Sequence, residues 1–556
     1  MTARVPRAAA FIIAQWHGRV RGFHPAWAAH PPRRIATVYV AKWIVMQPET
    51  QLLFLRGAGG DAFEALDLGK RRLRRAGEDE VSRFALLDTF DGEVAARGAL
   101  LVCSGAGADL MGAAAGTGAR LSQPRCRPGY VSEMPAGPVT SWLAGVVSPL
   151  RALIAVAEGE VVYRRLDLVD GREKTQVRCG LWTLHGQTGA QVTILRLEAL
   201  RGYDKAFRKL VEAITQGDMA VDLGPLAASA ALRGVDPAEI TGAVFDLAPE
   251  ERIIDTATRF LRAQLAVAGR NEPGIIADHD TEFLHDYRVA LRRARSVVAL
   301  FHDVFDAATR EELKRRLGAL MAPTGALRDL DVYLIERDTY ASLVSADRRR
   351  GIEKLFDRLA DRREAAQAEL AGWLKSPDYR QAMQECVMLL EGAGGLPPGP
   401  KAGRSALEYA RPLIWKRYRK VQRVAARIDA TSPDAAVHDL RIHCKKLRYA
   451  VEFFAPLFDG WDIARILKRL KTLQDTLGRF NDYAVQRQAL GAFSAELPGN
   501  TRDAIEVATS LGALMAVLEI RQAKERARVA TRFARFDAPE THRAFEAVCK
   551  PGGGAG

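Results

Sequence analysis

Apolar positions follow two different periods along the chain, and the change of period divides it. In the first part the apolar runs are short and strand-like, with Gly and Asp between them. Val161–Leu168 and Lys174–Trp182 flank a Val-Asp-Gly-Arg turn, which predicts a β-hairpin, and Gln191–Leu197 predicts a further strand. We expect an α+β domain with an antiparallel sheet over 46–220, followed by a linker over 221–239.

From about residue 237 the pattern changes to long amphipathic helices rich in Ala, Leu, Arg and Glu. A Gly- and Pro-rich segment interrupts them and can be neither helix nor strand. We therefore expect an all-α region made of one bundle over 240–390, a linker over 391–404, a second bundle over 405–548 and a flexible tail over 549–556.

The helical part contains an internal repeat. Residues 284–301 match residues 437–454 at an offset of 153 residues, and the match continues without a gap. The same offset pairs Phe305 with Phe458, Arg316 with Arg469, Leu317 with Leu470, Leu320 with Leu473, Gly325 with Gly478 and Asp329 with Asp482. Each half of this region is therefore one copy of a tandem duplication.

The matching helix of each repeat carries a basic stripe beside its apolar face, on a wheel of about 100° per residue. The first stripe is His285, Arg288, Arg292 and Arg295, and the second stripe is His438, Arg441, Lys445 and Arg448. Like charges at this spacing repel and are usually interleaved with acids, but neither stripe contains an acid. Further candidate cations beside the stripes or on the second helices are Arg293, Arg315, Arg316, Lys446, Lys468, Arg469 and Lys471.

The net charge of the chain also favours binding of a polyanion. The chain has 81 Lys and Arg against 67 Asp and Glu, a formal net charge of +14, which favours nucleic acid, anionic lipid or polyphosphate as partners. Arg forks and Lys ammonium groups in a row suit charge-assisted bonds to successive phosphates. A single basic helix face is commonly just solvated, and duplication of the whole stripe argues against that interpretation. Asp286 and Asp439 are expected to orient arginines or cap helices, and no residue is expected to be catalytic.

The pattern H-D-x-R-[VI]-x-x-[RK]-[RK]-x-R, present at 285–295 and 438–448, resembles the CHAD family, the conserved histidine α-helical domain. The resemblance implies two four-helix bundles related by pseudo-twofold symmetry, with both stripes facing a shared groove. It also implies binding of inorganic polyphosphate and association with polyphosphate granules. One departure is Thr324, where the second repeat has Leu477.

Three segments of the first domain resemble the CYTH family, whose fold is a triphosphate tunnel: Leu86–Phe90, Ala95–Leu100 and Leu195–Lys205. The resemblance implies that an ExExK triplet should hold a divalent metal and phosphate near the start of the domain. The chain reads Glu49-Thr-Gln-Leu-Leu53 there, and Leu101-Val-Cys-Ser104 where members carry arginines. We expect a degenerate, inactive tunnel domain without a cofactor, in which Mg²⁺ or Mn²⁺ would matter only if activity remained. Glu49 is equally explained as an exposed acid at a strand edge.

Residues 1–45 are basic and contain no acid, as in a disordered arm, and an upstream extension of the reading frame with Met46 as the start explains them as well. Six cysteines without a CxxC pair favour a reducing cytoplasm, and no apolar run is clean enough to span a membrane.

The sequence thus predicts a non-catalytic protein that binds inorganic polyphosphate, while its oligomeric state stays open. A metal-dependent inorganic triphosphatase of the CYTH type and a general nucleic-acid-binding protein are the alternatives. A specific nucleic-acid partner is not expected, because Tyr287 and Tyr449 are the only aromatic residues near the stripes that could stack on bases. A second basic helix that begins near Trp415 has cations spread around its wheel, so a solvated face is expected there.

Overall fold

The computed structural model describes residues 50–550 except 57–58, 106, 113–119, 217–222, 243–244, 393–394, 430, 498 and 500. The expected extension over 1–45, Glu49 and the tail from residue 551 lie outside the described residues. The chain divides into two compact units, and the second begins at Phe245. Each unit is described by itself.

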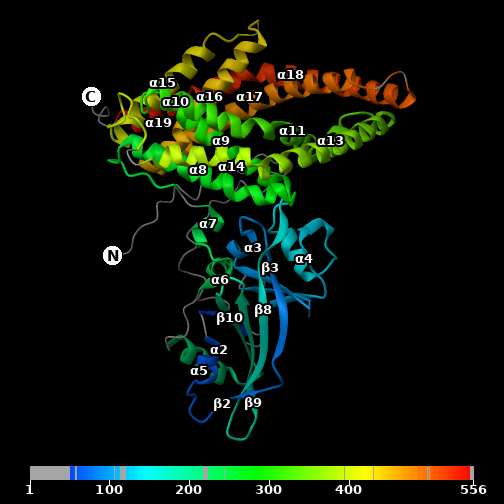
Figure 1. The fold of residues 1–556 in the computed structure, drawn as a ribbon, viewed down its shortest axis with the longest axis vertical. Helices are drawn as coiled ribbons and strands as arrows, with labels where there is room; N and C mark the ends of the chain where they lie inside the picture. The colour runs from blue at the N-terminus through cyan, green and yellow to red at the C-terminus, as the bar shows by residue number, and fades with distance from the viewer. Residues whose placement is uncertain are drawn as a thin grey trace. The chain divides into compact units, whose positions relative to one another are not determined.

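The N-terminal unit is built on one curled antiparallel sheet (Figure 1). Its strands are β1 Thr50–Arg56, β2 Arg72–Arg75, β3 Glu80–Asp88, β4 Ala99–Ser104, β5 Gly107–Gly112, β6 Arg120–Gln123, β7 Gly129–Tyr130, β8 Ala152–Val169, β9 Thr175–Gly186 and β10 Gln191–Ala199. Among the described residues the strand order is β1-β10-β9-β8-β3-β4-β5-β6, and β2 and β7 each pair with β8. The predicted hairpin is confirmed as β8–β9, and the predicted further strand as β10.

Both faces of the sheet are apolar, as alternation along β1 shows. Leu53 and Leu55 join a core cluster with α5 (Asp204–Gln216), while Phe54 between them joins a different cluster on the other face. The remaining helices of the unit are α2 Gly59–Glu64, α3 Glu93–Ala96, α4 Pro138–Ala144, α6 Gly224–Arg233 and α7 Pro237–Thr241.

The segment expected to be a linker over 221–239 contains α6 and the start of α7. Pro225 lies in the first turn of α6, and Gly234 ends the helix in the left-handed region at φ 70°. Ala228 and Leu232 are buried in the cluster that contains Phe54. Small apolar residues at helical spacing let this segment pack on the sheet, so it belongs to the N-terminal unit.

The second unit is all-helical, as expected. The first repeat contains α8 Ile253–Ile276, α9 Thr281–Leu300, α10 Ala307–Met321, α11 Gly325–Ile335, α12 Arg337–Ser342, α13 Arg349–Lys375 and α14 Pro377–Glu391. The second contains α15 Ala406–Ala425, α16 Asp434–Phe454, α17 Gly460–Ala495, α18 Arg502–Phe536 and α19 Pro539–Cys549. The offset of 153 residues relates the first residues of α8 and α15, α9 and α16, α10 and α17, and α13 and α18. Each repeat thus has four main helical segments followed by a shorter helix.

The repeats differ in their third helix. In the first repeat α10 ends at Met321, a short 3₁₀ turn over Ala322–Thr324 follows, and α11 begins at Gly325. In the second repeat α17 continues unbroken for 36 residues. Pro323 explains the break, because proline lacks the backbone N–H donor and clashes with the preceding turn, whereas the equivalent residue is Thr476.

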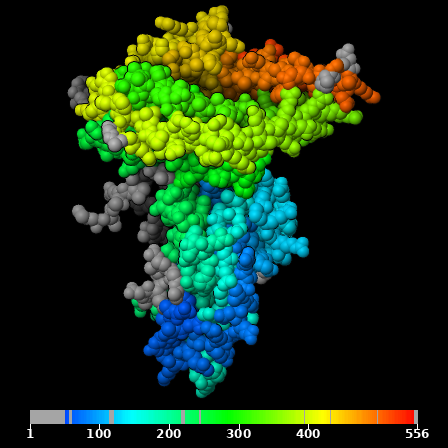
Figure 2. Space-filling view, in the orientation of Figure 1, coloured from blue at the N-terminus to red at the C-terminus, as the bar shows by residue number. Residues whose placement is uncertain are grey.

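Equivalent helices of the two repeats pack on each other: α9 on α16, α8 on α15 and α13 on α18. The equivalent residues Phe301 and Phe454 stack with ring centroids 5.5 Å apart. Such contacts are expected where a pseudo-twofold axis passes between the repeats. In Figure 2 the green surface of the first repeat runs without a gap into the orange surface of the second.

The expected linker between the repeats is irregular and is held against the first repeat. The backbone N–H groups of Gly399 and Lys401 donate to the carbonyls of Val304 and Asp303. Lys401 Nζ also lies 2.7 Å from the Asp303 carboxylate. Over the described ranges, no helix combines the length and the apolar character that crossing a bilayer requires.

Candidate functional site

The first stripe lies on α9, next to the junction of α10 and α11. Asp280 caps this helix by accepting from the backbone N–H groups of Glu282 and Phe283. The apolar face of α9 is buried, which holds the stripe at the edge of the bundle. Arg288 Nη1 donates to Thr324 Oγ1, and Arg295 Nη1 lies 3.3 Å from Met321 Sδ.

The second stripe lies on α16 and faces α17 in the same way. Arg448 Nη1 donates to Gln474 Oε1 at 3.2 Å, at the position equivalent to Met321. His438 Nδ1 lies 2.7 Å from Asn481 Oδ1, and Arg441 Nη2 lies 3.9 Å from Asp482 Oδ1. Each stripe therefore lies between the second and third helices of its repeat, and the duplication preserves this geometry.

Three cations crowd together in the first repeat. Burial lowers the pKa of Arg288, and the neighbouring charges of Arg292 and Arg328 lower it further, while Asp329 opposes them. Arg328 on α11 is itself half-buried, and its Nη1 has no hydrogen-bond partner among the residues that the structure describes. Sequence reasoning missed Arg328, although the repeat match had already marked its neighbour Asp329. The equivalent residue in the second repeat is the neutral Asn481.

The two stripes come together at Glu452 on α16. Burial raises the pKa of this carboxyl, while the charges of Arg448, Arg293 and Arg292 oppose the rise. Arg448 Nε is 2.5 Å from Glu452 Oε1. Arg293 is buried against α16, and burial lowers its pKa to about 10. Cations of both helices therefore converge on one carboxylate of the second repeat.

Glu452 lies just beyond the second stripe, and the stripes themselves contain no acid, as expected. That expectation holds over 285–295 and 438–448, but one turn after Arg448 an acid occupies the stripe side of α16. The equivalent residue of the first repeat is Ala299, so the acid is not duplicated. Glu452 neutralises part of the positive charge where α9 and α16 meet, and the other cations of the stripes stay uncompensated by it.

Several stripe cations stay open to solvent. Arg292 and Arg295 are exposed, and across the part of the chain that the structure describes they form no ion pair. Three neighbouring lysines also form no ion pair among the described residues: Lys446, Lys468 and Lys471. Lys468 is exposed, and the other two are half-buried. These side chains are available to a ligand.

Three other candidate cations are engaged within the fold. Arg315 pairs with Glu312 at 2.6 Å, and Arg316 bridges Glu312 and Glu385 of α14. Arg469, the equivalent of Arg316, donates to the Arg535 carbonyl and lies 3.6 Å from Glu540 of α19. Arg316 and Arg469 tie the third helix of each repeat to its last helix, whereas Arg315 pairs within α10, and the charge of all three is partly compensated.

The remaining candidates take structural roles that limit other chemistry. Tyr287 is fully buried and donates toward the Leu320 carbonyl, so it cannot stack on a base. Asp439 lies 3.5 Å from His443 one turn along α16. No group of three or more metal-ligating side chains occurs within the described ranges. The arrangement is a pair of crowded cationic helix edges, whose mutual repulsion an anion would relieve.

Residues 259–491, which carry both stripes, match the family model of the CHAD domain. The helical unit is a CHAD domain. It is similar to the CHAD domain from the plant Ricinus communis, with 27% identity over 53% of this chain and 94% of that chain and a TM-score of 0.44. It is also similar to PptA from Streptomyces chartreusis, with 19% identity over 51% of this chain and 99% of that chain and a TM-score of 0.40. No curated protein matches the chain.

Outside the CHAD domain, the curled sheet of the N-terminal unit closes around α6. This helix contacts β1 and β4, which four strands separate in the sheet order, as well as β8, β9 and β10. A helix of 10 residues can reach strands so far apart only from the concave side of the curl. Apolar side chains pack on the concave face, among them Phe54, Leu86, Trp182 and Ile194. Charged side chains lie on the same face, since Arg120 stands over the Trp182 ring at 5.0 Å and Arg196 follows Ile194 by two residues on β10.

Proposed function

We propose that the CHAD domain binds inorganic polyphosphate through the first and second stripes. The observation that supports it best is the duplicated placement of cations between the second and third helices, with Arg292 and Arg295 open and unpaired among the described residues. Crowding of like charges is unfavourable in the free protein. A chain of phosphates would offer each guanidinium and ammonium group a charge-assisted partner.

A plain phosphate chain fits the stripes better than a nucleic acid does. The stripes present Arg forks and Lys ammonium groups, and of the two aromatic residues near them Tyr287 is buried in the core and Tyr449 is half-buried. Binding of single strands normally uses base stacking on exposed aromatic rings. Association with polyphosphate granules would follow from the same contacts.

We further propose that the N-terminal unit is a degenerate CYTH-like domain without triphosphatase activity. A triphosphate tunnel needs alternating charged residues on its concave face, and here that face carries Phe54 and Leu86 and is covered by α6. On β1, Leu53 joins the α5 cluster on the opposite face, so the expected position of the motif's lysine faces away from the curl.

Phosphate release from tripolyphosphate tests this second proposal. The full chain with excess Mg²⁺ or Mn²⁺ should release no more phosphate than buffer, even at high protein concentration. A metal-dependent release that scales with protein concentration would contradict it and favour the triphosphatase alternative.

Charge reversal in the stripes tests the first proposal. The double replacement of Arg292→Glu and Lys445→Glu should weaken binding of long-chain polyphosphate at least about 100-fold, because it removes two charge-assisted contacts worth roughly 1.5–3 kcal/mol each. Arg419→Glu with Arg423→Glu on α15 makes the same charge change at exposed positions outside the stripes. This control should cost only a few-fold in affinity.

Isothermal titration calorimetry of the full-length variants measures both effects. The milder pair Arg292→Gln with Lys445→Gln separates loss of contact from loss of fold, since neutral residues add no repulsion beside Glu452. Equal losses in the stripe and control variants would show that total charge, and not the stripes, determines binding.

A further inference from the structure

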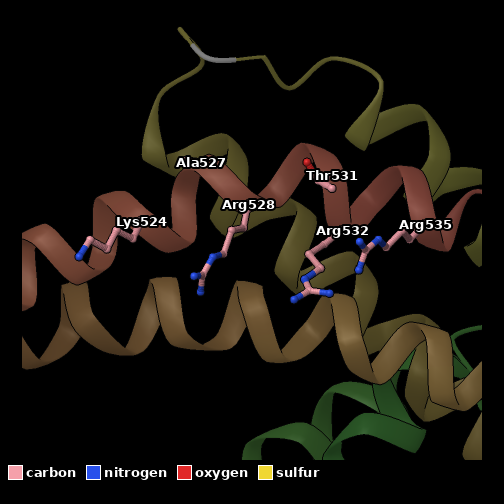
Figure 3. A pocket seen from close by; sticks show the side chains of 6 residues that line it. All are labelled: Lys524, Ala527, Arg528, Thr531, Arg532 and Arg535. Atoms are coloured by element: carbon pink, nitrogen blue, oxygen red, sulfur yellow. The ribbon is translucent and has the colours of Figure 1, made fainter.

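A third row of cations lies on α18, outside both stripes. Figure 3 shows Lys524, Arg528, Arg532 and Arg535 projecting from α18 around a shallow hollow of about 350 Å³. Ala527 and Thr531 complete its lining. The spacing of the cations places them along one side of the helix. These four residues are called the α18 row below.

Most of the positive charges in the α18 row have no acidic partner among the described residues. Arg528 lies 2.9 Å from Glu525, which also pairs with Arg479 of α17 at 3.0 Å. Within the ranges that the structure describes, the side chains of Lys524, Arg532 and Arg535 form no ion pair or hydrogen bond. Three like charges spaced along one helix face repel each other and attract an anion.

The α18 row is not duplicated in the first repeat, where only one of the four equivalent positions is basic. The equivalent positions hold Ala371, Lys375, Tyr379 and Ala382. Moreover, α13 ends at Lys375 and the chain turns at Pro377 into α14, whereas α18 continues to Phe536. Arg532 and Arg535 therefore lie on a helical extension that only the second repeat possesses, while Lys524 and Arg528 lie on the part of α18 that is equivalent to α13.

The surface of α17 connects the α18 row with the second stripe. Gln474 and Asn481 of α17 contact the second stripe, while Arg469 and Arg479 contact α18 from nearly the opposite side of the helix. On the solvent-facing side between them lies Lys468, and Lys471 follows close by on the same helix. Lys468 and Lys471 are thus cations on the side of α17 between the second stripe and the α18 row, and the exposed Asp475 follows Lys471 one turn further along.

We propose that the α18 row is an additional phosphate-binding surface that holds the part of a long polyphosphate chain extending beyond the second stripe. This inference rests on the proposed function of the stripes. Its occupant is a linear inorganic phosphate chain, because the hollow is lined by Ala527 and Thr531 and offers no aromatic ring for a base. The surface makes binding asymmetric between the repeats and dependent on chain length.

Charge reversal of the row tests this inference with two ligands of different length. In the full-length protein, Arg532→Glu with Arg535→Glu should weaken long-chain polyphosphate about tenfold at near-physiological salt, and tripolyphosphate hardly at all. The stripe variant Arg292→Glu with Lys445→Glu should weaken both ligands. Arg419→Glu with Arg423→Glu serves again as the matched control, and Arg532→Gln with Arg535→Gln repeats the test without adding negative charge.

Each outcome decides between the possibilities. A loss confined to the long chain, and larger than in the control, supports the α18 row as an additional surface. A loss no larger than in the control, or an equal loss for both ligands, overturns it and leaves the stripes as the binding site. If the unmodified protein binds neither ligand, both this inference and the proposed function are wrong.

Discussion

Glu452 and Arg293 illustrate how environment, and not residue type, decides what a charged side chain does. Arg293 belongs to the repeated basic motif, yet it is buried against α16. Glu452 is an acid whose buried carboxyl meets cations from both repeats. Breaking a buried pair leaves an uncompensated charge, so these residues join the repeats and are poor positions for testing ligand binding.

Gly351 is a second residue whose role appears only in the packed structure. A Cβ atom at this position of α13 would lie 2.2 Å from Ser510 Oγ and 2.6 Å from the Glu506 carbonyl oxygen of α18. The absence of a side chain therefore lets the fourth helices of the two repeats approach closely. Nothing in the local sequence around Gly351 marks this contact.

Replacing Gly351→Ala should destabilise the helical unit by about 1–3 kcal/mol, because α18 has to move away. Gly372→Ala in the same helix is the matched control, since a Cβ atom there meets nothing within 4 Å. The control should gain about 0.5–1 kcal/mol from helix propensity. Thermal unfolding followed by far-ultraviolet circular dichroism measures both, and a midpoint raised in both variants would refute the close approach of α13 and α18.

At the scale of elements, the repeat offset predicted the helical part well. The positions of α9 and α16, and the apolar faces that they bury, follow from the 3.6-residue period and the duplicated motif. The hairpin β8–β9 followed from alternation and its turn. Local sequence patterns are sufficient to predict such helices and strands, because the spacing of the residues on one buried face reveals the type of element.

Other elements depended on contacts between distant parts of the chain. The short Ala-rich segment of α6 looked like a linker, because only the concave face of the sheet gives it a place to pack. Glu385 and Glu540 engage Arg316 and Arg469 from helices far along the sequence, so a wheel of one helix could not reveal these pairs. The α18 row escaped notice because it is not repeated.

At the scale of the whole chain, the two units differ in where they carry charge. The CHAD domain presents two duplicated stripes and one unrepeated row of cations, whereas the N-terminal unit packs an apolar cluster between α6 and the concave face of its sheet. Binding through many ion pairs should weaken steeply as salt rises, since the phosphates release counterions when the protein neutralises them. Selectivity for polyphosphate must therefore be judged at near-physiological salt.

The most direct test of the central claim is a calorimetric titration of the full chain with long-chain polyphosphate, with single-stranded and duplex DNA titrated under the same conditions. The duplicated stripes predict tight binding of polyphosphate and clearly weaker binding of both DNA forms. Weak binding of polyphosphate, or equal binding of all three ligands, would contradict the proposed function and reduce the cationic surface to a general attraction for polyanions.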